Sequence, residues 1–73
     1  MIRVVRNKLT GKFINIDPIL IESDEYDDAI QATIFNEEVD ELSDADVIEY
    51  IASSYPTPVD LEIVPIKIKC DIL

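Results

Sequence analysis

The sequence contains no histidine, no tryptophan, one cysteine and one glycine. Without histidine, a serine or cysteine nucleophile lacks its commonest general base, and a Cys/His metal site cannot be built. One glycine excludes a glycine-rich phosphate loop, and the lone Cys70 excludes an internal disulfide. We therefore expect a protein that is not an enzyme and that uses no metal or cofactor.

Basic residues are missing from the whole middle of the chain, where fifteen acids lie between Phe13 and Ile66. The net charge of −10 argues against direct nucleic-acid binding, because that requires a basic footprint to neutralise phosphates. All Lys and Arg residues lie near the two ends of the chain: Arg3, Arg6, Lys8, Lys12, Lys67 and Lys69.

Long apolar runs are also absent, and the start MIRVVRNK lacks the apolar region of a signal peptide. A single thiol suits a reducing compartment, so we expect a cytoplasmic protein. Abundant isoleucine, valine and leucine nevertheless predict an ordered core. At this length, residues 1–73 are expected to form a single domain.

The N-terminal residues 2–16 predict a β-hairpin. Two β-branched runs flank NKLTGK, in which Asn7 can open the turn and Gly11 can take a positive φ. Asp17-Pro18 ends the second strand, and ILIE at 19–22 is compatible with a short third strand or a buried connection.

Residues 24–35 predict a first helix, because Tyr26, Ile30 and Ile34 recur at four-residue intervals behind an acidic first turn. The alternative for residues 29–35 is a strand, since IQATIF also alternates and is rich in β-branched residues.

A second helix is predicted from Ser43 to about Ser54. Ser43 is its N-cap and Asp46 completes a capping box, with Leu42 and Val47 spaced as a hydrophobic staple. Val47, Ile48, Ile51 and Ala52 form an apolar stripe, and the YPTP sequence at 55–58 cannot continue the helix.

The C-terminal residues 59–73 predict a strand with a break or bulge at Pro65, where the apolar alternation changes phase. The expected fold is therefore α+β: a small antiparallel sheet, formed by the N-terminal hairpin and the C-terminal strand, with two helices on one face. The expected order is β-β-(β)-α-α-β. This layout places the basic residues on a sheet rim and most acids on a helical face.

The acidic face is the candidate site. Carboxylates three or four residues apart on a helix lie about 5–6 Å apart at Cβ, a spacing that can imitate a row of phosphates. The ordinary alternative is a solvated face whose acids favour helix N-termini. However, no lysine or arginine compensates these acids within the predicted helices, and their mutual repulsion costs stability. The candidate partner-binding residues are Asp24, Asp27, Asp28, Glu37, Glu38, Asp40, Glu41, Asp46, Glu49 and Tyr50.

Two other uses of the sequence are weaker. The stretch DELSDADVIE has neither the glycine nor the spacing of a calcium loop. The terminal CDIL formally matches a prenylation box, but Cys70 also fits as a strand residue in phase with Ile68 and Ile72.

Two functional hypotheses follow. The first is a non-enzymatic acidic protein that engages a basic surface of a partner, plausibly a nucleic-acid-binding protein. Its most concrete form is an inhibitor that mimics nucleic-acid charge, and size and charge alone suggest the analogy with small inhibitors of phages or mobile elements. The alternative is a structural module that forms a homodimer or larger oligomer through the alternating C-terminal strand.

Overall fold

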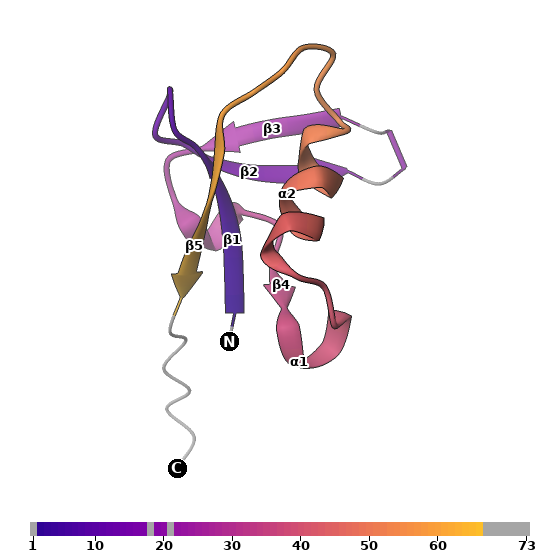
Figure 1. Ribbon diagram of the computed structural model, residues 1–73. Coiled ribbons are helices and arrows are strands. Elements are labelled where there is room, and N and C mark those ends of the chain that lie inside the picture. The colour runs from indigo at the N-terminus through magenta and orange to yellow at the C-terminus, as the bar shows by residue number, and fades with distance from the viewer. Residues whose placement is uncertain (1, 18, 21, 67–73) are drawn as a thin grey trace.

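The computed structural model describes residues 2–17, 19–20 and 22–66, and within this part the chain is α+β, as predicted. A five-stranded antiparallel sheet carries two helices and a short 3₁₀ helix (Figure 1). The strands are β1 (Ile2–Asn7), β2 (Phe13–Asp17), β3 (Glu22–Tyr26), β4 (Phe35–Asn36) and β5 (Leu61–Ile66). The helices are η1 (Ala29–Gln31), α1 (Glu37–Asp40) and α2 (Asp44–Ala52).

The first strand, β1, is the centre of the sheet. It pairs with β5 along its whole length, from Ile2 opposite Ile66 to Asn7 opposite Leu61. On its other side it pairs with β2 only where Arg6 faces Phe13, and with β4 near its start. In Figure 1, β2 and β3 run nearly crosswise to β1 and β5, so the sheet is strongly bent.

The predicted hairpin is confirmed. The Gly11 amide donates to the Asn7 carbonyl at 2.8 Å, and Gly11 takes φ +72°, which glycine adopts without strain. The Asn7 side chain also organises the turn, since its Oδ1 accepts from the Leu9 amide at 2.9 Å. Local sequence alone therefore accounts for this turn.

The helix predicted over residues 24–35 is wrong. Residues 22–26 instead form the edge strand β3, which pairs with β2 from Asp17 opposite Glu22 to Phe13 opposite Tyr26. Only η1 is helical in this region, and Ile30 at its centre is exposed. The strand alternative for residues 29–35 is also mostly wrong, because only Phe35 of that range enters a strand. Pairing with β2 outweighs the local helical spacing, since it satisfies a row of backbone groups.

The second helix is confirmed, with its predicted capping box present. The Ser43 Oγ accepts from the Asp46 amide at 3.2 Å, while the Ser43 amide donates to Asp46 Oδ2 at 3.3 Å. The helix ends at Ala52 with Ser53 as its C-cap, before the two prolines. Its apolar stripe covers the sheet, and Val47 and Ile51 are fully buried.

The break predicted at Pro65 is also wrong. The β5 register continues through this residue, with Pro65 opposite Arg3 and Ile66 opposite Ile2. Within the described chain, β5 pairs with β1 alone and is therefore an edge strand, where proline is tolerated. The remainder of the predicted C-terminal strand, with Cys70, lies outside the described residues.

The hydrophobic core lies between the sheet and α2. Its buried cluster is Val5, Ile14, Phe35, Val47 and Ile51. Val5 contributes from the centre of β1 and Phe35 from β4, so the sheet and helix cannot separate without exposing both.

Candidate functional site

The acidic segment, defined as residues 36–49, forms one end of the molecule beside the start of β1 (Figure 1). Asn36 caps α1, because its Oδ1 accepts from the Glu38 amide at 3.1 Å. This four-residue helix ends at Asp40, and its C-cap Glu41 has a φ of +56°. Ser43 then begins α2. Two short-range caps therefore hold this segment as two short helices joined by a turn.

A buried arginine fixes this segment to the sheet. Arg3 is only 1% exposed, and its Nη2 donates to Asp40 Oδ1 at 3.0 Å. Its Nη1 donates to Asp44 Oδ1 at 2.9 Å and to the Leu42 carbonyl at 3.0 Å. The hydrogen bond that Arg3 donates to Asp44 and the charges of Asp40, Asp44 and Glu37 raise the pKa of Arg3, against the effect of its burial. We call Arg3, Asp40, Asp44 and the Leu42 carbonyl the arginine clamp.

The clamp divides the predicted partner-binding acids into two groups. Asp40 is largely enclosed, and its carboxylate is engaged by Arg3. By contrast, Glu38, Glu41 and Glu49 are exposed and form no ion pair with any residue in the described ranges. Asp46 is exposed as well, but its carboxylate also closes the capping box. The uncompensated charge therefore lies on the outer side of α1, at the turn and on α2.

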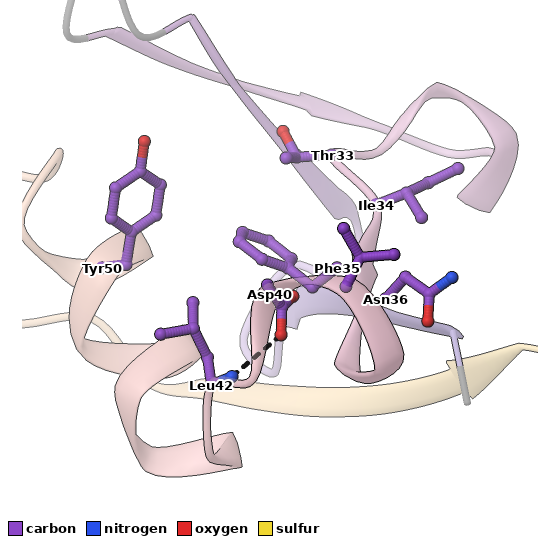
Figure 2. A pocket seen from close by; sticks show the side chains of 8 residues that line it. Thr33, Ile34, Phe35, Asn36, Asp40, Leu42 and Tyr50 are labelled. Carbon is purple, nitrogen blue, oxygen red and sulfur yellow. Dashed lines mark hydrogen bonds between the residues drawn. The ribbon is translucent and has the colours of Figure 1, made fainter.

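An apolar groove of about 340 Å³ lies between the acidic segment, residues 33–35 before it and Tyr50 after it. Its apolar lining comes from Ile34, Phe35, Val39, Leu42 and Tyr50, and its polar lining from Thr33, Asn36 and Asp40. Figure 2 shows Phe35 at the centre, with Tyr50 on the α2 side and Ile34 on the strand side. Leu42 and Asp40 lie beneath, joined by the hydrogen bond from the Leu42 amide to Asp40 Oδ1 at 2.9 Å.

Tyr50 lies at the edge of this groove. Its ring is perpendicular to that of Phe35, with centroids 6.1 Å apart and an interplanar angle of 76°. Although it packs on Phe35, Tyr50 remains 45% exposed, as predicted from its position among polar residues of the helix. Tyr50 thus packs against Phe35 and lines the groove while part of its side chain stays exposed.

The other predicted acids are not brought to this surface as a helical face. Asp24 lies in β3, at the opposite side of the sheet from β4, while Asp27 and Asp28 follow the strand. Asp28 has a local role, since its Oδ1 accepts from the Ile30 amide at 3.0 Å. The expected alignment of these three acids depended on the helix at 24–35, which does not form.

The basic residues do not form a free rim either. Arg3 is buried in the clamp, Arg6 pairs with Glu62 while stacking over Phe13, and Lys8 lies 3.9 Å from Asp60. The prediction that the basic residues lie on a sheet rim is wrong for Arg3, which is buried, whereas Arg6 and Lys8 remain partly exposed and are paired with acids. Each one offsets an acid that lies far from it in sequence.

Sequence reasoning missed the arginine clamp and the groove. Arg3 lies 37 residues before Asp40, so no local spacing connects them. A signal for the groove was present, because Val39 and Leu42 are apolar residues inside the acidic stretch EEVDEL. Leu42 was assigned to a hydrophobic staple, while Val39, which is 79% exposed, was not used.

A second polar cluster lies at the opposite end of β1. Glu25 accepts hydrogen bonds from the buried Asn7 Nδ2 at 3.3 Å, from the Thr10 hydroxyl and from the Tyr55 hydroxyl at 3.4 Å. Burial raises the pKa of Tyr55, and the Glu25 charge acts in the same direction. This cluster joins the hairpin turn, β3 and the end of α2.

No group of three or more acids or thiols in residues 2–17, 19–20 and 22–66 is arranged to hold a metal ion. Within the same ranges, no helix is both long enough and apolar enough to cross a bilayer. The chain matches no known family model, no curated protein and no solved structure. The site must therefore be interpreted from its own chemistry.

Proposed function

We propose that this chain is a non-enzymatic binding protein whose acidic segment engages a basic surface of a partner protein. The observation that supports this is the set of exposed, unpaired carboxylates Glu38, Glu41 and Glu49 on a rigidly held segment. Lysine and arginine are absent from residues 13–66, and Arg3 pairs with Asp40 and Asp44, so the repulsion among Glu38, Glu41 and Glu49 is relieved by no ion pair within the described chain. A basic partner would relieve that repulsion on binding.

The finer form of the proposal is an inhibitor that occupies a nucleic-acid-binding groove of its partner. Asp46 and Glu49 are three residues apart on α2, which places their Cβ atoms about 5–6 Å from each other. That separation is of the order of the phosphate spacing along a nucleic-acid strand. A phage or mobile-element origin belongs to the same analogy and rests on size and charge.

The test is capture of nucleic-acid-binding proteins from a lysate on the immobilised chain, at low and at high salt. Screening shortens the Debye length from about 10 Å at 0.1 M to about 3 Å at 1 M, so capture should be lost at high salt. Retention of no nucleic-acid-binding protein at low salt would exclude the inhibitor form of the proposal.

A matched pair of variants locates the contact. Glu38→Lys with Glu41→Lys should reduce capture at least about 10-fold, because each reversal turns an attraction into a repulsion. Asp24→Lys with Asp27→Lys changes the net charge equally on the β3 side of the sheet and should have little effect. Asp40 is left unchanged in both variants because the clamp requires it. Equal loss in the two variants would show that net charge alone, and not this surface, governs capture.

The alternative function, self-association, is favoured by one observation. The β5 strand lies at an edge of the sheet in the described chain, so its outer backbone groups are open to pairing with a second copy. Pro65 works against such pairing, since it removes one backbone donor from this strand. Light scattering over a concentration series tests this function, and a monomer at every concentration would exclude it.

A further inference from the structure

We infer that the apolar groove takes a single large apolar side chain of the partner, held between flanking lysine or arginine residues that contact the acidic rim. The inference rests on the proposed function and specifies its ligand: a basic protein segment with one apolar anchor. A surface that imitates nucleic acid by charge alone would not need this groove.

The first reason is that apolar side chains are gathered here and remain exposed. Val39 is 79% exposed, Ile34 50% and Tyr50 45%, and all three line the same groove. Other exposed aliphatic residues, such as Ile19 after β2 and Ile30 in η1, lie outside it. A contiguous apolar surface with a polar rim is typical of a binding site, whereas scattered exposed residues are ordinary.

The second reason is that the groove is held open by buried contacts. Its floor, Phe35, is 8% exposed, belongs to the core cluster and is paired through β4 with Arg3. Its α1 wall is fixed because Asp40 and the Leu42 carbonyl are bonded to Arg3. An occupant therefore meets a preformed surface and loses little free energy in ordering it.

The third reason is the charge next to the groove lining. Glu38, Glu41 and Glu49 each directly precede a lining residue, Val39, Leu42 and Tyr50 respectively, and they are exposed without an ion-pair partner in the described chain. These three carboxylates form the acidic rim. The rim thus offers hydrogen-bond acceptors and negative charge, and no lysine or arginine of the described chain pairs with it. An occupant with Lys or Arg on both sides of the anchor matches this pattern, and an acidic one is repelled.

The experiment measures binding of labelled synthetic peptides by fluorescence polarisation. The probe has the sequence Gly-Lys-Arg-Phe-Lys-Arg-Gly; one control replaces phenylalanine by serine, and another replaces the four basic residues by serine. We expect the phenylalanine peptide with basic flanks to bind roughly 10-fold more tightly than either control. The serine control lacks the buried aromatic anchor, which contributes at that level. The other control lacks the attraction between basic residues and the acidic rim.

Two variants of the chain locate the anchor. Val39→Ser should remove most of the preference for phenylalanine over serine, while Leu9→Ser, the same kind of change at an equally exposed site, should leave it intact. Val39 is exposed enough that its replacement leaves the fold intact, which circular dichroism verifies. Amide chemical shifts should change at Ile34, Val39 and Tyr50 on binding.

Each other outcome overturns the inference in a distinct way. Equal binding of both basic peptides, unchanged in Val39→Ser, would exclude the groove and leave the charge-based function standing. Equal binding of the phenylalanine peptide without basic flanks would assign the groove to an uncharged apolar ligand. Shift changes at the groove on raising protein concentration alone would assign it to a second copy. No binding of any basic peptide would contradict the proposed function itself.

Discussion

The two ends of β1 carry buried polar side chains that hold exposed loops in different ways. At one end, Arg3 holds the acidic segment through Asp40, Asp44 and the Leu42 carbonyl. At the other end, Asn7 holds the hairpin turn through its own Oδ1, and its Nδ2 donates to Glu25. The first anchor is charged and the second is neutral. The charged one is the anchor that lies beneath the apolar groove and its acidic rim.

The same contrast appears in the backbone. Both loops contain a residue of positive φ: Gly11 in the hairpin turn, at +72°, and Glu41 after α1, at +56°. Glycine adopts this conformation freely, whereas a residue with a Cβ is strained there. The hairpin turn is thus built from residues that suit it locally, while the acidic segment keeps a charged residue at a strained position. Such strain is typical of functional surfaces.

The largest expected effect comes from the charged anchor. Arg3→Met should lower the melting temperature by on the order of 15 °C, because it leaves Asp40 enclosed without its cation. Asn7→Ala, the matched change at the neutral anchor, should lower it by roughly 5–10 °C, since the change removes a small volume and two hydrogen bonds, one to the Glu25 carboxylate, but leaves no charge enclosed without its cation. Thermal unfolding followed by circular dichroism measures both. A larger loss for Asn7→Ala would reverse the comparison.

A smaller effect on stability is expected from substituting either of the two positive-φ residues. Gly11→Ala should destabilise the protein by about 1–2 kcal/mol through backbone strain alone, because no atom lies within 4 Å of the added Cβ. Glu41→Gly should stabilise it by roughly 0.5–1 kcal/mol, since relief of strain exceeds the greater chain entropy of glycine. Urea unfolding gives both free energies. A destabilising Glu41→Gly would show that the Glu41 side chain contributes contacts that outweigh its strain.

The smallest effect on stability is expected at alkaline pH and concerns Tyr55, which lies at the Asn7 end of β1. The pKa of Tyr55 is raised by burial, so the folded state retains this proton above about pH 10, where the unfolded chain loses it. The resulting stability is complete below about pH 10 and is lost as the pH rises through the folded pKa. Tyr55→Phe should therefore show a shallower alkaline loss of stability than the parent chain. Identical alkaline slopes of melting temperature would contradict this assignment.

The parts of the fold that sequence predicted correctly are those with short-range causes. Gly11 and Asn7 specify the hairpin turn, and Ser43 with Asp46 specifies the start of α2. Every contact involved joins residues no more than a few positions apart. The α+β class followed from these elements, because a hairpin and an amphipathic helix must cover each other's apolar faces.

The errors arose where distant pairing decides the structure. The sequence ESDEY is polar and suits an acidic first turn of a helix, yet it forms β3 because β2 offers a free edge for pairing. Likewise, Pro65 continues β5 because the facing strand β1 pairs on both sides of it. Neither outcome can be predicted from the local spacing of residues, because both depend on pairing with a strand that is distant in sequence.

The candidate site was predicted in part. The acidic stretch and the exposure of Tyr50 were visible in the sequence, but the division of the acids was not. Asp40 resembles its neighbours in sequence, and only its position opposite Arg3 assigns it to the clamp. Val39 and Leu42 gave a local signal for the groove, but its assembly could not be predicted, since Ile34, Val39 and Tyr50 come from three separate segments.

The sequence by itself determined the charge, the hairpin turn, the caps of α2 and the absence of histidine chemistry. Composition and contacts within a few residues are sufficient for each of these. Only the tertiary structure decided which carboxylates are neutralised and which remain exposed around an apolar groove. The physical reason is that one arginine, 37 and 41 residues before its two aspartates, is buried against them by the packing of the whole sheet.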